Sequence, residues 1–211
     1  MDGAQFVDAV RTAKATELDR LGSEKALVAT TNARLDREQV LATTAAAERR
    51  AEDTFRAWAA DEPTPEARDA FEDVAEEEAA HRDRVAAAMG ASPDEDVEAD
   101  MLHDHLRGVE GTPERVAAGL VGRPLASART LLQVVNFFVN EADAQAADLF
   151  RDLRADTEAM TDRGAILLET VCETDAEWDR AREAATETVQ VAYDQYAGTL
   201  REMGLDPKPV C

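Results

Sequence analysis

The chain has 211 residues, a formal net charge of −22 from 45 acidic and 23 basic residues, and only 5% aromatic residues. Such an acidic surface repels nucleic-acid phosphates and anionic membranes. Neither nucleic acid nor a membrane is therefore an expected partner. Alanine, glutamate, leucine and arginine are abundant and all favour helices, and no stretch alternates as a half-buried strand does. The expected fold class is therefore all-α.

The composition also indicates an environment. An acidic, lysine-poor chain is typical of proteins from a salt-rich cytoplasm, where dissolved ions screen the repulsion between like charges. The segment MDGAQFVDAV lacks the basic and apolar regions of a signal peptide, and no apolar run is long enough to cross a bilayer. Cys172 and Cys211 are too few for a disulfide framework. We therefore expect a cytoplasmic protein with free thiols.

Prolines and glycines divide the chain, because proline seldom lies inside a helix. We expect a single domain over residues 1–211. Its predicted parts are an N-terminal helical arm, a first helical hairpin, a crossover with short helices, a second hairpin and a tail, over residues 1–35, 36–90, 91–125, 126–204 and 205–211. The long helices are predicted over residues 36–60, 65–89, 126–155 and about 161–203. Helices of this length in two hairpins form a four-helix bundle.

The N-terminal arm is predicted to be amphipathic, with an interruption at Gly22. Its apolar positions are Phe6, Val10, Ala13 and Leu21. A short helix cannot bury such a face alone, so the arm must pack either on its own bundle or on a neighbouring molecule. On this ground we predict a homodimer.

The segment FEDVAEEEAAHRDRV, residues 71–85, contains the first candidate site. Apolar residues follow one another at steps of three and four, and the same spacing continues through Glu78 and His81. These two side chains are therefore expected on the face that points to the core, where an i, i+3 pair can share an ion.

The helix over residues 36–60 repeats this anomaly, because Glu48 lies in the middle of its apolar stripe. Burying a carboxylate without a partner is costly, so Glu48 requires a cation or a metal. One alternative is that the bundle opens to water at this level. The other is ion pairing with nearby arginines, namely Arg49, Arg50 or Arg82.

Two further histidines, His103 and His105, stand in the sequence MLHDHL. Side chains at positions i and i+2 do not share a helix face. We therefore interpret this pair as a surface feature of the crossover rather than as a metal site.

The second half of the chain partly repeats the first, as expected of a bundle built from two hairpins. DTFRAWAAD resembles ADLFRDLRAD, and EEEAAHRDR resembles ETDAEWDRA. These alignments place Asp143 opposite Glu48, Asp175 opposite Glu78, and Trp178 opposite His81.

With these motifs, residues 36–203 resemble the ferritin-like superfamily and in particular its rubrerythrin-like branch. In that branch two helices each supply a Glu and the other two each supply a Glu-x-x-His motif. The resemblance implies metal-ligand roles for Glu48, Glu78 and His81. Rubrerythrins proper also carry a rubredoxin module with paired Cys-x-x-Cys motifs, and two isolated cysteines exclude that module here.

The second half departs from the family pattern. Asp143, or else the nearby Glu141, would supply the carboxylate of the third helix. In the fourth helix Asp175 is a shortened carboxylate, Trp178 cannot bind a metal, and Glu173 stands nearby as a substitute. We therefore expect at most about one tightly held ion per chain, fewer than the two of the family.

Three functions remain open from the sequence. The first is a ferritin-like protein that binds iron or another divalent ion. For this protein the resemblance alone implies a role in iron or peroxide handling and hence an oxidoreductase activity. The second is a member that has lost its metal and serves as a structural or interaction module. The third is an unrelated all-α enzyme with an acidic pocket.

Overall fold

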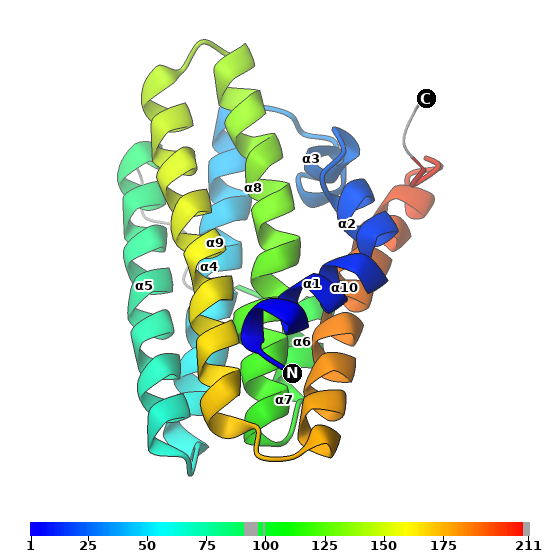
Figure 1. Ribbon diagram of the computed structural model, residues 1–211. Coiled ribbons are helices and arrows are strands. Elements are labelled where there is room, and N and C mark those ends of the chain that lie inside the picture. The colour runs from blue at the N-terminus through cyan, green and yellow to red at the C-terminus, as the bar shows by residue number, and fades with distance from the viewer. Residues whose placement is uncertain (91–96, 99, 209–211) are drawn as a thin grey trace.

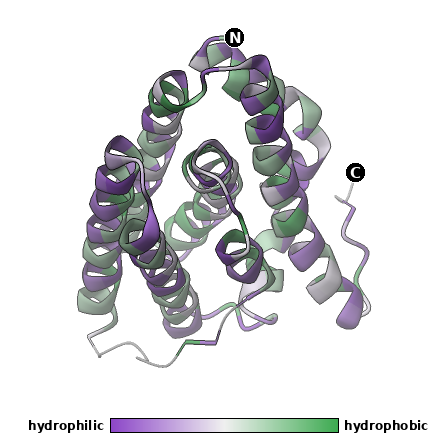
Figure 2. Cartoon of the chain, turned by 90° about the horizontal axis from the view of Figure 1, so that it is seen from below, coloured by the Kyte–Doolittle hydropathy of each residue, from purple (hydrophilic) through white to green (hydrophobic). Residues whose placement is uncertain are grey.

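The computed structural model describes residues 1–90, 97–98 and 100–208, and within these ranges it contains helices and no strand. The all-α class is therefore confirmed. The long helices lie side by side (Figure 1), and each carries both hydrophilic and hydrophobic residues when the molecule is seen from below (Figure 2). None of the described helices is long and apolar enough to cross a membrane.

The N-terminal arm contains three short helices, α1 (Gly3–Ala13), α2 (Ala15–Leu21) and α3 (Lys25–Thr30). It folds back on its own bundle, with α1 against α9 (Ala144–Val171) and α10 (Asp175–Glu202), and with α2 and α3 against α8 (Arg123–Asn140) and α10. Phe6 and Val10 are fully buried there. The arm covers its apolar face within one chain, so burying that face does not require a second molecule. The dimer stays a prediction.

The first hairpin has the predicted boundaries to within a residue or two. Asp36 caps α4 (Arg37–Asp61) by accepting a hydrogen bond from the backbone of Gln39. Pro65 opens α5 (Pro65–Met89), and Gly90 ends it with a φ of 69°, a left-handed conformation that glycine adopts without strain. The two helices pack against each other along their length.

The second half differs from the prediction. The crossover contains α6 (Met101–Arg107), as expected, but residues 91–96 and 99 lie outside the described part. The helix predicted to start at residue 126 begins much earlier, with α7 (Thr112–Ala117), and continues through a π-helical turn, η1 (Ala118–Gly122), into α8. The predicted helix over 126–155 is interrupted at residues 141–143, and the predicted break between 155 and 161 lies inside α9.

The physical reasons for these errors are local. Ala142 adopts a φ of 57° and Asp143 caps α9, so the turn forms without the glycine or proline that was used to locate breaks. Gly164, interpreted as a helix start, instead lies inside α9, where a Cβ atom would approach the Leu120 side chain to 2.7 Å. This glycine permits close helix packing and does not end a helix.

Pro124 was also interpreted as a break. It lies two residues after the end of η1, where hydrogen bonding from residue i to i+5 already departs from the α-helical pattern, so the missing amide of proline is tolerated. The π-helical turn also changes the rotational phase of the helix, and it ends immediately before Arg123, which is buried.

The buried apolar residues form two main clusters along the bundle. One contains Phe55 and Val74, and the other contains Leu41 and Val85. On both α4 and α5, the buried residues between the two clusters are polar. A polar layer therefore crosses the core about halfway along the first hairpin.

Cys172 is buried and forms no disulfide with any described residue, while Cys211 lies outside the described residues. Burial, together with nearby carboxylates, raises the pKa of Cys172 to about 11.

Candidate metal centre

Three residues of the first hairpin lie together in this polar layer. Glu48 comes from α4, and Glu78 and His81 come from successive turns of α5. Their exposed fractions are 8%, 2% and 2%. One ligand atom of each lies within 4.8 Å of those of the other two, so one ion can contact all three.

The imidazole ring of His81 has two different environments. Its Nε2 atom lies 3.1 Å from Oδ2 of Asp156 on α9. Its Nδ1 atom lies 3.8 Å from Glu48 and 3.9 Å from Glu78, beyond hydrogen-bonding distance, and is buried without a partner among the described residues. Histidines that bind metals usually donate their other N–H to a carboxylate, which fixes the tautomer. Asp156 thus orients His81 with Nδ1 toward the two buried carboxylates.

The protonation states reflect this crowding of charge. Burial, together with the neighbouring Glu78 carboxylate, raises the pKa of Glu48 to about 8. Burial lowers the pKa of His81, but Glu48 and Glu78 outweigh it and raise the pKa to about 10. Burial opposes ionisation of Glu78, yet Arg123 and the other two residues hold its pKa well below its usual range. Without a metal, Glu48 and His81 are therefore protonated at neutral pH.

Sequence reasoning missed Arg123 as well as Asp156. Its guanidinium donates to Glu78 Oε1, lies 3.1 Å from the sulfur of Met160, and stands 5.2 Å from the ring centre of Phe55. Only 5% of the residue is exposed. Because Pro124 was interpreted as a helix break, residue 123 was predicted to lie in the crossover. Nothing in the sequence indicated that Arg123 points inward.

The arginines considered as partners of Glu48 in the sequence have other partners. Glu52, which is also buried, pairs with one of these arginines, Arg82. The observed pairs are Arg49 with Asp53, Arg50 with the backbone of Glu98, and Arg82 with Glu52.

The second half of the chain brings none of its four candidate carboxylates into the cluster. Glu141 is exposed at the end of α8. Asp143 caps α9 and lies 3.1 Å from Arg37 Nε, and thirteen residues of helix, about 20 Å, separate it from Asp156. Asp175 is exposed in the first turn of α10. The internal alignment fails because it matched the interior of one helix to the beginning of another.

Trp178, aligned with His81 in the sequence, packs in the apolar core with its ring centre 5.7 Å from that of Phe6. The exposed Glu173 is equally outside the cluster. His105 lies 3.2 Å from Thr188 Oγ1, and His103 lies 2.7 Å from Asp100 Oδ1. Among the described residues, neither belongs to a group that could hold a metal.

A second, outer group shares His81. Glu77 and Asp156, both partly exposed, have carboxylate oxygens within 4.8 Å of an imidazole nitrogen of His81 and of each other. Arg163 pairs with Glu77, and Arg84 lies 3.7 Å from Asp156. The outer carboxylates are thus already compensated by arginines at the surface.

Comparison of the chain with protein-family models, curated proteins and solved structures found no match. The geometry of this site and the sequence pattern therefore carry any functional argument. In chemical terms, the inner site offers one imidazole nitrogen and two carboxylates, a donor set that suits zinc, ferrous iron or manganese.

Proposed function

We propose that this protein is a ferritin-like metal-binding protein of the rubrerythrin-like type, with two helical hairpins, α4–α5 and α7–α8 with α9, and with α10 as an additional helix. It binds one divalent ion per chain through Glu48, Glu78 and His81, and the resemblance favours iron. The observation that carries the proposal is the buried Nδ1 atom of His81, which faces two buried carboxylates and has no described hydrogen-bond partner. A buried polar atom in such a position requires a partner.

Arg123 supports one ion rather than two. Its positive charge compensates Glu78 on the side of the cluster that faces α8, so one cationic position is filled by the protein itself. No further carboxylate or histidine of the described residues joins the inner group. A bound divalent ion would supply Lewis acidity and a site for an oxygen ligand. Oxygen or peroxide reduction by a two-ion route is expected to be absent or weak.

A second candidate function is a metal-free structural or interaction module, and the same arginine favours it. With Glu48 and His81 both protonated, the charges of Glu78, His81, Arg123 and Asp156 balance without a metal. In that case the polar layer would serve only to fix the packing of the hairpins.

Metal content separates the two. We expect protein purified without chelator to contain close to one divalent ion per chain by elemental analysis. Anaerobic titration with ferrous iron should show one tight site. Two equally tight ions per chain would contradict the half-site proposal, and no binding of iron, manganese or zinc would favour the metal-free module.

Glu48→Gln is the most informative variant. Because the pKa of Glu48 is about 8, its side chain is already neutral at pH 7, so glutamine preserves the charge and shape of the metal-free protein. The fold should persist while the ion loses a ligand, and affinity should fall about 10–100-fold. Glu141→Gln is the matched control, because Glu141 is exposed and outside the cluster. His81→Ala should abolish tight binding, whereas His103→Ala should not.

A further inference from the structure

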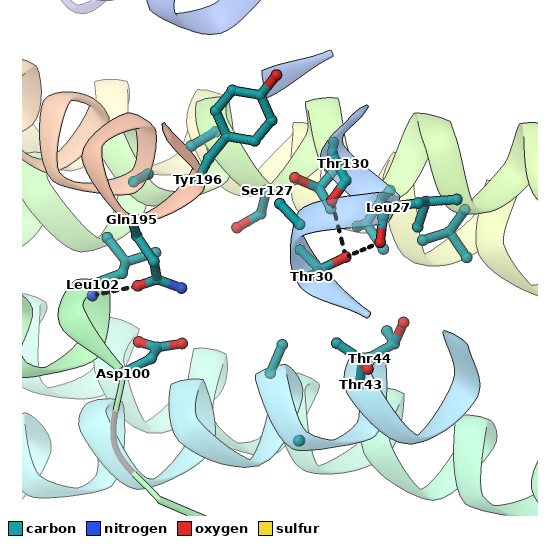
Figure 3. A pocket seen from close by; sticks show the side chains of 18 of the residues that line it. Leu27, Thr30, Thr43, Thr44, Asp100, Leu102, Ser127, Thr130, Gln195 and Tyr196 are labelled. Carbon is teal, nitrogen blue, oxygen red and sulfur yellow. Dashed lines mark hydrogen bonds between the residues drawn. The ribbon is translucent and has the colours of Figure 1, made fainter. Parts of the chain in front are cut away.

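A cavity of about 670 Å³ lies beside the metal-site residues, between α4, α8 and α10, with α3 along its side. Its volume falls in the range of about 300–1,000 Å³ that holds small molecules. Figure 3 shows Thr43 and Thr44 of α4 facing Ser127 and Thr130 of α8 across this space, with Gln195 and Tyr196 contributed by α10. Glu48 and Arg123 line it as well, so the cavity reaches the polar layer of the core.

The charged groups in the cavity wall compensate one another. Asp100 lies 2.7 Å from the Nδ1 atom of His103 and 3.6 Å from Arg50. Arg123 pairs with Glu78, and Glu48 lies 3.8 Å from His81. The wall therefore has no charged group without an oppositely charged neighbour, and a ligand with a net charge would gain no ion pair there.

The uncharged polar groups offer mainly hydrogen-bond acceptors. Most threonines of the wall donate their hydroxyl proton to a carbonyl of their own helix, which leaves only the oxygen lone pairs free. This holds for Thr30, Thr31, Thr44, Thr157 and Thr199. Such a wall favours a ligand that donates hydrogen bonds.

Two atoms of residues in the wall, Nε2 of His103 and Nε of Arg123, lack partners among the described residues, but both are buried and do not open onto the cavity. His103 is 4% exposed and Arg123 is 5% exposed. The polar groups that a ligand reaches are therefore mainly the hydroxyls and amides of the wall.

Apolar side chains also line the cavity. Val40 stands eight residues before Glu48 on α4, and Leu131 stands eight residues after Arg123 on α8, so each is about 12 Å along its helix from the polar layer. Leu27 and Val134 line the same region, together with Gln39, Thr43 and Thr130. The cavity is therefore elongated, and both hydrocarbon and hydrogen-bonding groups line it along its length.

We propose that this cavity binds a neutral, elongated alcohol, whose hydroxyl groups donate hydrogen bonds to the threonines of the wall and whose hydrocarbon chain lies against Leu27 and Leu131. The inference goes beyond the metal site and does not depend on it, since every contact it uses exists without an ion. A bound alcohol would lie beside Glu48, and thus next to any ion held there.

The test uses three eight-carbon probes on the full chain: 1,2-octanediol, octanoate and octylammonium. Isothermal titration calorimetry should show saturable binding of about one diol per chain, and binding at least about tenfold weaker for both ions. Chelator is present throughout, so the result is independent of the metal proposal. Equal or tighter binding of an ion would overturn the neutral-ligand argument.

Two leucine variants locate the site. Ala46 lines the cavity from α4 and is half-buried, so Ala46→Leu fills space without entering the closed core. Ala86 on α5 is also half-buried and does not line the cavity, so Ala86→Leu is the matched control. Diol affinity should fall about tenfold or more in the first variant and stay unchanged in the second. If wild-type protein binds no diol, or if Ala46→Leu binds it as well as wild type, the cavity holds only water and the proposal fails.

Discussion

Replacing Arg123 with methionine would remove the internal cation of the polar layer while keeping most of the side-chain volume. Arg123 and Glu78 have side-chain exposures of only 6% and 2%, so the carboxylate that loses its partner has no access to water. Removing one partner of a buried ion pair typically costs about 3–5 kcal/mol. Glu78 would be forced to take up a proton.

Protonation of Glu78 limits this cost. Its ordinary pKa of 4.5 lies about 2.5 pH units below 7, and each unit corresponds to about 1.4 kcal/mol. The loss of unfolding free energy at pH 7 should therefore be about 3 kcal/mol. In the wild type the depressed pKa of Glu78 contributes stability above its unfolded value of 4.5, and this contribution is lost as the pH falls through the folded pKa. The difference between variant and wild type should accordingly be largest near pH 7 and shrink toward pH 4.5.

Urea denaturation in the presence of chelator, followed by circular dichroism at both pH values, measures these differences. Arg163→Met is the control, because Arg163 pairs with Glu77 at the surface with 46% of its side chain exposed, and such pairs contribute at most about 1 kcal/mol. Equal losses in the two variants would refute the view that Arg123 acts as a buried counter-ion.

A divalent ion should then compensate for the missing arginine. An ion at a hundred times its dissociation constant stabilises a protein by about 2.7 kcal/mol. If the ion and Arg123 both neutralise Glu78, zinc should stabilise Arg123→Met more than it stabilises wild type. An equal or smaller effect in the variant would mean that the ion binds away from Glu78, and the assignment of the site would be wrong.

Three further outcomes are expected. Metal binding at pH 7 should release protons, because Glu48 (pKa about 8) and His81 (pKa about 10) must both lose theirs, and the metal affinity should therefore rise by up to about a hundredfold per pH unit between pH 6 and 8. Calorimetry in buffers of different ionisation enthalpy measures the proton release, and a result of none would exclude these ligands. The melting temperature should rise from low to molar potassium chloride, because salt screens a net charge of −22; an unchanged value would contradict the expected adaptation to salt. Gly164→Ala should lower the free energy of unfolding by about 1–3 kcal/mol, because the added Cβ atom meets Leu120 at 2.7 Å. Gly198→Ala, whose Cβ atom would have no atom within 4 Å, should stabilise α10 by up to about 1 kcal/mol. Denaturant unfolding that ranks the two variants in the opposite order would contradict the packing of α9 on η1.

The first hairpin was predictable because its boundaries carry explicit local signals. Asp36 acts through a side-chain oxygen that accepts a backbone hydrogen bond, and Gly90 through a left-handed backbone conformation. The interruption of the apolar stripe by Glu48 and Glu78 indicated the polar layer correctly. These features depend on one helix at a time. Periodicity alone was therefore sufficient to bring the inner triad together.

The second half was not predictable by the same means. The turn before Asp143 uses an alanine with positive φ, which no sequence rule favours, and Pro124 lies inside a continuous helix because the preceding turn is π-helical. The inward direction of Arg123 depends on that turn, so the counter-ion of Glu78 could only be found once the helix phase was known. The contribution of Asp156 likewise depended on knowing that residues 144–171 form one helix.

The π-helical turn lets this helix hold one residue more than an α-helix would between the same two faces. A turn with hydrogen bonds from residue i to i+5 contains about one residue more than an α-helical turn, so deleting one residue from η1 would restore α-helical spacing and leave the two flanks facing nearly the same directions. Arg123 would still point toward Glu78, and α7 would still pack against α10. We therefore expect natural variants of this chain either to keep the spacing between Thr112 and Arg123 or to shorten it by one residue, with a regular α-helix in place of η1.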